Sequence, residues 1–215
     1  MKQAGELEPA PAVALAWQPV ASRPALAALF MLDLRLATLV RRAREPMLAQ
    51  VRLAWWRERL EEAPGSRPLG EPLLSEITAH WGGAGERLSS LVDGWEQLLD
   101  DPPFTAEAID DFASGRGAAL AAFAELAGVP NEMLAAHSAG RMWGLADIAA
   151  RESGETAKSA RELASREPAV PVRTSGLRGV AVLGGLARRA LRRGEAPMQG
   201  RGAALAAIRL GMFGG

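Results

Sequence analysis

The chain contains no cysteine and only two histidines among its 215 residues. Without cysteine it cannot form a disulfide framework, a thiolate zinc site, an iron–sulfur cluster or a cysteine nucleophile. The two histidines, His80 and His137, are too few for a site with several histidine ligands, and neither has an acid and a nucleophile at a spacing typical of Ser/His/Asp catalysis. Function must therefore rest on other residue types.

Long apolar runs are also absent. The longest uninterrupted run, residues 25–32, has eight residues, and the run 118–124 has seven, whereas a helix needs about 20 to span a bilayer. The first residues include early acids and no apolar stretch of signal-peptide length. We therefore expect a cytoplasmic protein with at most peripheral membrane contact.

The net charge is zero, with 25 Lys and Arg against 25 Asp and Glu. No excess of positive charge points to nucleic acid, so no nucleic-acid partner is expected. The charges are nevertheless segregated: residues 35–59 carry seven arginines and two glutamates, and residues 71–132 carry twelve acids and two arginines. Either basic and acidic helices pack side by side, or the arginines form an anion pocket.

Ala, Leu and Arg dominate, and no alternation of apolar and polar residues persists. This composition predicts an all-α protein. Residues 1–21, with three prolines, are predicted to be an irregular N-terminal arm, followed by one helical domain over 22–215. Caps, breakers and helical periodicity predict long helices over the ranges 22–40, 46–62, 84–99, 105–127 and 131–152.

The helix over 46–62 carries two arginines inside its apolar arc. On a helical wheel Arg52 and Arg59 fall between two apolar sides, one with Trp55 and the other with Trp56. A buried guanidinium needs a partner, and its fork of donors matches phosphate oxygens. Arg52 and Arg59 are therefore the candidate diphosphate-binding residues, with internal ion pairing or extension to solvent as the alternative.

Asp33 lies within the apolar stripe of the first long helix. A single aspartate supplies one ligand, whereas magnesium on a diphosphate takes one or two carboxylates plus phosphate oxygens and waters. We therefore expect Asp33 to form a salt bridge with an arginine, Arg52 being the first choice.

The helix over 131–152 places Gly140, Gly144, Asp147 and Arg151 on one face. The glycines permit a close helix–helix approach, and Asp147 either lines a cavity there or simply pairs with Arg151 at i,i+4. The stripe of small residues on the preceding predicted helix, 105–127, is interpreted as a surface for helix packing. The six tryptophans either fill the core or wall a lipid-chain cavity. Candidate cavity-lining residues are Asp33, Trp55, Trp56, Gly140, Gly144, Asp147 and Arg151.

The stretch SRPALAALFMLDLRLATLVRRAREPMLAQVRLAWWRERLEE, residues 22–62, resembles the opening helices of the squalene/phytoene synthase family, most specifically at 45–60. Residues 91–101 and 112–129 are also similar to that family, and 139–151 more weakly. The resemblance implies a single isoprenoid-synthase-like bundle around a central cavity. It also implies head-to-head joining of two prenyl diphosphates, with magnesium held by two aspartate-rich motifs.

The chain departs from the family where those motifs stand. Positions 37–41 match the first Asp-x-x-x-Asp motif but begin with Ala37 and end with Arg41. In the second motif Asp147 replaces an asparagine ligand, Arg151 replaces the following aspartate, and Glu155 stands at a later position. A divergent branch that includes a mitochondrial complex I assembly factor is similar in lacking the aspartates.

These residues predict a catalytically degenerate family member. It would bind a prenyl diphosphate or a polyprenyl lipid, or act as an assembly or scaffold factor for a protein partner. No cofactor is expected, and the sequence identifies no catalytic residue. The alternative is an active prenyl transferase that condenses two prenyl diphosphates through Arg52, Arg59 and Asp147, and only that alternative requires Mg²⁺.

Overall fold

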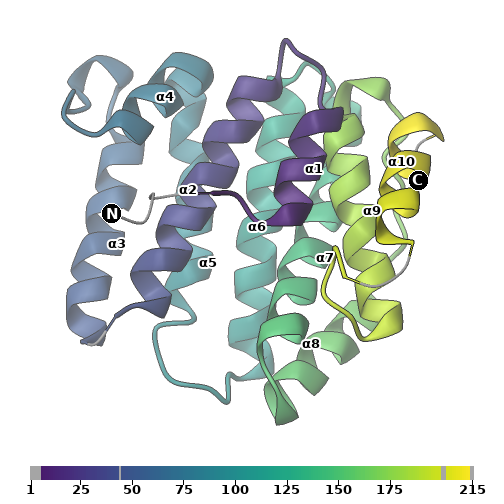
Figure 1. Cartoon of the computed structure of the whole chain (residues 1–215). Helices are drawn as coiled ribbons and strands as arrows, with labels where there is room; N and C mark the ends of the chain where they lie inside the picture. The colour runs from purple at the N-terminus through teal and green to yellow at the C-terminus, as the bar shows by residue number, and fades with distance from the viewer. Residues whose placement is uncertain (1–5, 44, 200–201, 214–215) are drawn as a thin grey trace.

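A computed structural model describes residues 6–43, 45–199 and 202–213, and in these ranges the protein is all-α. The chain runs back and forth through helices that pack side by side (Figure 1). Their bounds are α1 (Pro9–Trp17), α2 (Arg23–Arg41), α3 (Pro46–Glu61), α4 (Pro72–Trp81), α5 (Ser89–Glu96), α6 (Ala106–Leu126), α7 (Met133–Arg151), α8 (Gly154–Arg166), α9 (Arg178–Arg193) and α10 (Ala203–Phe213).

Helices α2, α3, α6 and α7 confirm four of the predicted long helices. The fifth, predicted over 84–99, is wrong in its first part: the segment Gly82–Leu88 is a 3₁₀ helix, and only α5 is α-helical. Glycines in this segment disfavour a regular helix. One of them, Gly85, also lies under the Arg67 guanidinium, whose two terminal nitrogens would be 3.0 Å from a Cβ at that position.

The prediction of an irregular arm over 1–21 is wrong for residues 9–17, which form α1; residues 1–5 lie outside the described part. Pro9 and Pro11 lie in the first turn of α1, where the backbone N–H groups have no partner within the helix. Beyond the helix, the buried amide of Gln18 donates to the Gly176 carbonyl at 2.8 Å and accepts from the Gly179 N–H at 3.1 Å. The end of α1 is therefore fixed to the start of α9.

The segregated charges meet between neighbouring helices. Arg57 of α3 pairs with Asp93 of α5 at 2.8 Å and with Glu96 at 2.5 Å. Arg141 of α7 pairs with Asp110 of α6 at 2.6 Å. The interpretation that basic and acidic helices pack side by side is therefore confirmed for α3 and α5, whereas Arg141 lies outside the predicted basic segments.

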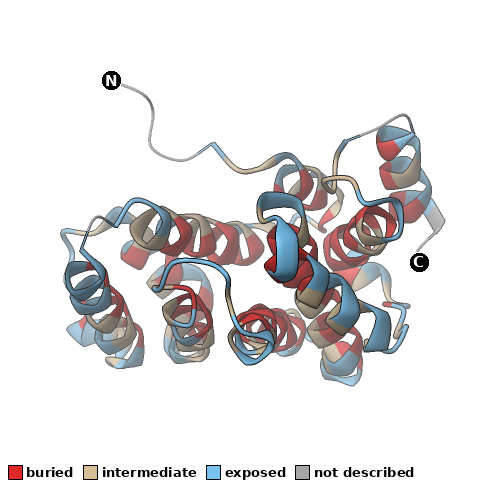
Figure 2. Ribbon diagram, turned by 90° about the horizontal axis from the view of Figure 1, so that it is seen from below, coloured by how far each residue is buried: buried red, intermediate tan, exposed pale blue. Residues whose placement is uncertain are grey.

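Buried residues lie on the faces that the helices turn toward one another (Figure 2). Helices α6 and α7 approach each other closely: a Cβ on Gly140 would lie 2.5 Å from the Arg116 carbonyl oxygen. A Cβ on Gly144 would lie 3.0 Å from Ala113 Cα. The two glycines thus confirm the predicted close contact, and this contact sets Arg116 of α6 beside Asp147 of α7.

Among the described residues, none of the helices combines the length and the apolar content that crossing a bilayer requires.

Candidate functional site

Arg116 lies at the centre of the bundle, and 3% of its side chain is exposed. Its Nε and Nη2 atoms donate to the two carboxylate oxygens of Asp33 in α2, at 2.8 and 2.7 Å. Its Nη1 atom donates to Asp147 Oδ2 at 3.1 Å. One guanidinium therefore joins three helices through two carboxylates that are nearly as buried as itself.

Aromatic rings surround this guanidinium. Its Cζ atom lies 3.9 Å from the ring centre of Trp143, 4.7 Å from Phe112 and 5.3 Å from Trp95. The Trp95 indole also donates to Asp33 Oδ1 at 2.9 Å. Burial opposes the charged form of Arg116, but the attraction of Asp33 and Asp147 outweighs it, so the pKa of Arg116 is raised above the ordinary arginine value.

The sequence analysis did not select Arg116, because its segment was interpreted as a packing stripe. A signal was present nevertheless: Arg116 is the only charged residue in the stretch 113–124, between Gly115 and Gly117. A charge isolated among small and apolar residues needs a buried partner. That requirement could have linked Arg116 to the inward-facing Asp33.

A second, more exposed layer of charges covers the Arg116 centre. Arg41, at the end of α2, donates to Asp147 Oδ2 at 2.9 Å, and Arg151, at the end of α7, donates to Asp147 Oδ1 at 2.5 Å. Both arginines also pair with Glu8, which lies 3.8 Å from Arg41 Nη1 and contacts Arg151 Nη2. The predicted pairing of Asp147 with Arg151 is confirmed, whereas Glu8 was missed because it lay in the expected arm.

The pKa values of Arg151 and Arg116 are shifted in opposite directions. Burial lowers the pKa of Arg151 below the ordinary arginine value, against a weaker opposing effect of Glu152. The side chains of Glu8, Arg41 and Arg151 keep 34–40% of their surface exposed. This outer layer is therefore the part of the cluster that a solute can reach.

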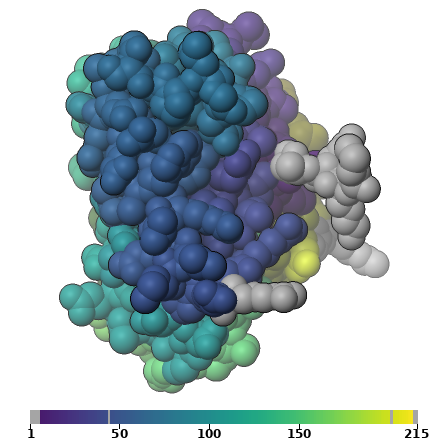
Figure 3. Space-filling model, turned by 90° about the vertical axis from the view of Figure 1, so that its left-hand side faces the viewer, coloured from purple at the N-terminus to yellow at the C-terminus, as the bar shows by residue number. Residues whose placement is uncertain are grey.

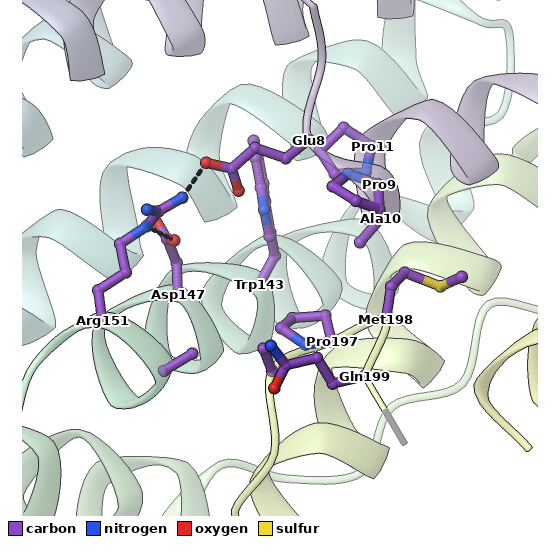
Figure 4. Close-up of a pocket in the computed structure, with 12 residues that line it drawn as sticks. Glu8, Pro9, Ala10, Pro11, Trp143, Asp147, Arg151, Pro197, Met198 and Gln199 are labelled. Carbon is purple, nitrogen blue, oxygen red and sulfur yellow. Dashed lines mark hydrogen bonds and ion pairs between the residues drawn. The ribbon is translucent and has the colours of Figure 1, made fainter. Parts of the chain in front are cut away.

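A pocket of about 390 Å³ opens beside this outer layer. Glu8, Asp147 and Arg151 lie at one end, and the remaining wall is largely apolar (Figure 4). The volume lies within the range of small-molecule sites, roughly 300–1,000 Å³. The apolar wall is formed by Pro9, Ala10, Pro11, Trp143, Ala150, Ala196, Pro197 and Met198, with Gln199 at its edge.

A second pocket, of about 380 Å³, also includes Arg41 and Arg151. Its wall is more polar and includes Asp100, Asp101 and Glu152. A third pocket, with Arg116 and Asp33 in its lining, has a volume of about 10 Å³. The charged cluster thus fills the middle of the bundle and leaves room beside it.

The two candidate diphosphate-binding residues are not part of this cluster. Arg52 is exposed, with no ion pair or hydrogen bond to another described residue, and Arg59 pairs with Glu58 at 3.2 Å and Glu62 at 3.0 Å. The wheel argument was wrong because α3 is apolar on two sides. The buried side consists of Ala49, Leu53, Trp56 and Leu60, whereas Met47, Leu48, Val51 and Trp55 face outward.

The candidate cavity-lining residues divide into three groups. Asp147 and Arg151 line the 390 Å³ pocket. Asp33 forms the predicted salt bridge to an arginine, but the partner is Arg116 rather than Arg52. The remaining four have other roles: Gly140 and Gly144 pack α7 against α6, Trp56 is buried in the core, and Trp55 is partly exposed on the outside.

The carboxylates of the site do not suit Mg²⁺. The described residues contain no group of three or more His, Asp and Glu that could hold a metal ion. Each oxygen of Asp33 and Asp147 already accepts a hydrogen bond from a guanidinium. Arginine cations therefore occupy the environment that metal ligation would require.

The family model described as squalene/phytoene synthase matches residues 11–161 of the chain. Neither a search of curated proteins nor a search of solved structures returns a match.

Proposed function

Because this chain belongs to the squalene/phytoene synthase family, we propose that it is a non-catalytic member that binds an isoprenoid diphosphate beside Arg41 and Arg151. The observation that carries this proposal is that two partly exposed guanidiniums lie next to a largely apolar pocket. The guanidiniums match the phosphate oxygens of such a ligand, and the pocket matches its hydrocarbon chain.

The Arg116 centre argues against turnover. Departure of a diphosphate requires neutralisation of its developing charge, which magnesium held by carboxylates can supply. Here the inward carboxylates, Asp33 and Asp147, are bound to arginines. The positions of the first motif's carboxylates are Ala37 and Arg41. Binding without condensation follows from this arrangement.

Calorimetric titration of the full chain with farnesyl and geranylgeranyl diphosphate, with and without magnesium, tests the proposal. We expect binding that does not depend on magnesium. Loss of a charge-assisted contact in Arg41→Gln or Arg151→Gln should weaken the affinity roughly tenfold or more. Arg52→Gln is the matched control, because it removes an exposed guanidinium that has no ion pair within the described chain. Absence of binding, or equal weakening by the control, would reject the diphosphate site.

The scaffold alternative is supported by a different feature, the outward side of α3. Met47 and Val51 are 76% and 62% exposed, and Leu48 and Trp55 lie beside them. Helix α3 covers the face shown in Figure 3. Arg42, just before α3, and Arg52 within it are both exposed. An apolar strip with flanking guanidiniums fits a protein partner whose own apolar strip is flanked by carboxylates.

A photo-crosslinking residue placed at Val51 tests this alternative, with the same group at the exposed Leu69 as control. Support would be a crosslink from position 51 alone, mapped to an apolar segment flanked by acids on one protein. A crosslink to lipid would instead favour peripheral membrane contact. The cytoplasmic location stays a prediction that cell fractionation can check.

A further inference from the structure

Glu8 occupies the position between the two guanidiniums that the proposed ligand requires. Its carboxylate lies between Arg41 of α2 and Arg151 of α7, and it also forms part of the pocket wall (Figure 4). Glu8 directly precedes the first residue of α1. A contact made by this side chain therefore holds the beginning of α1 over the site.

The charges of the cluster balance with Glu8 in place. The guanidiniums of Arg41, Arg116 and Arg151 are met by the carboxylates of Glu8, Asp33 and Asp147. Asp33 and Asp147 are buried, whereas Glu8 is 40% exposed. A phosphate group added to this balanced cluster would repel Glu8, and Glu8 is the only one of these three carboxylates that can move into solvent.

The two ends of α1 are held very differently. At its C-terminal end the buried Gln18 amide bonds to Gly176, Gly179 and Ser22, and the Ala14 carbonyl packs so tightly on Gly179 that a Cβ there would lie 2.5 Å away. At its N-terminal end Ala10 and Pro11 are buried, but the polar contacts are the partly exposed ion pairs of Glu8, and exposed pairs contribute little. The beginning of α1 is therefore held by weaker polar contacts than its end.

From this asymmetry we infer that Glu8 is a built-in competitor of the anionic ligand, so that a phosphate-bearing ligand enters by displacing the Glu8 carboxylate from Arg41 and Arg151. The inference rests on the proposed diphosphate site and adds its regulation. Displacement frees two guanidiniums at once and releases the first turn of α1, which forms one wall of the pocket. Occupancy of the site and the position of α1 are thereby coupled.

The first test needs no ligand. Hydrogen exchange of the full chain is compared between wild type, Glu8→Gln and Glu6→Gln. Glu6 is an exposed acid two residues earlier, so its variant makes the same change in charge without removing the contacts. We expect faster exchange over residues 12–14 in Glu8→Gln only, with residues 179–183 unchanged. Unchanged exchange in Glu8→Gln would show that Glu8 does not hold α1 and would overturn the inference.

The second test measures affinity with two probes, inorganic pyrophosphate and farnesyl diphosphate. Glu8→Gln should bind both roughly three- to tenfold more tightly than wild type, as loss of two exposed ion pairs predicts, and Glu6→Gln should match wild type. If wild type binds and Glu8→Gln binds no more tightly, the competitor role is rejected while the diphosphate site stands. If neither protein binds either probe, the diphosphate site itself is rejected, and the inference with it.

Discussion

Arg116 and Asp33 form a two-point salt bridge between α6 and α2, with donor–acceptor distances of 2.8 and 2.7 Å and both side chains buried. The two residues lie 83 positions apart in the chain. Asp33 also accepts a hydrogen bond from the Trp95 indole, and Arg116 also donates one to Asp147. The bridge is therefore the polar centre on which the packing of α2, α6 and α7 depends.

Arg116→Met should lower the free energy of unfolding by about 3–5 kcal/mol, because removing one partner of a buried pair leaves the other charge uncompensated. Among the described residues, Asp33 would keep only the Trp95 hydrogen bond, whereas Asp147 would keep its ion pairs with Arg41 and Arg151. Urea denaturation measures the loss. The double variant Arg116→Met with Asp33→Leu should lose less than the single one, since it removes both charges. A single variant as stable as wild type would contradict the central role of this bridge.

Removing an exposed guanidinium on α3 is expected to leave the free energy of unfolding almost unchanged. Arg52→Leu should change the free energy of unfolding by less than about 0.5 kcal/mol, because Arg52 is solvated and makes no ion pair with the described residues. The same urea measurements compare it directly with Arg116→Met. A loss of several kcal/mol in Arg52→Leu would restore the buried position that the helical wheel first suggested.

The contrast between Arg52 and Arg116 shows what could be predicted from the sequence. Periodicity and caps located α2, α3, α6 and α7, because these signals are local. The inward position of Asp33 and the close approach at Gly140 could also be predicted, because a single apolar stripe or a single pair of glycines defines one face of a helix. The wheel failed for α3 because two apolar sides leave its orientation to tertiary packing. Arg116 and Glu8 were missed because their partners lie on distant segments.

Gly140→Ala should destabilise the protein by roughly 1–3 kcal/mol, since its Cβ would lie 2.5 Å from the Arg116 carbonyl oxygen, and a backbone atom cannot yield as a side chain can. Gly144→Ala, at 3.0 Å from Ala113 Cα, should cost less. Gly83→Ala is the control, because no atom lies within 4 Å of its Cβ position. Thermal unfolding of the three variants should rank them in this order, and an unchanged melting temperature for Gly140→Ala would contradict the close approach of α6 and α7.

His137 should make stability depend on pH. The pKa of His137 is lowered from its ordinary value of 6.5, because burial and the nearby Arg141 both oppose protonation, more than Glu167 favours it. The unfolded chain therefore binds the proton more readily, and stability present above about pH 6.5 falls as the pH drops below that value. Urea denaturation at pH 7.5 and 5.5 should show a smaller decrease for His137→Gln than for wild type. His80→Gln is the control, and an equal decrease in wild type and His137→Gln would exclude this role.

The family's reaction should not occur in this protein. Purified chain incubated with farnesyl or geranylgeranyl diphosphate and millimolar magnesium should form no condensation product and release no pyrophosphate above a heat-treated control. Two arginines, Arg41 and Arg151, bind Asp147 at the site, and the sequence resemblance implies that they stand where the family has aspartates. The remaining inward carboxylate, Asp33, is held by Arg116. The positively charged arginines would repel the metal ions, so a bound prenyl diphosphate would keep the bond between its carbon and its diphosphate.

Magnesium-dependent release of pyrophosphate that is lost in Asp147→Asn would establish the prenyl transferase alternative instead. Asp100→Asn, in the neighbouring pocket, serves as the matched control for that loss.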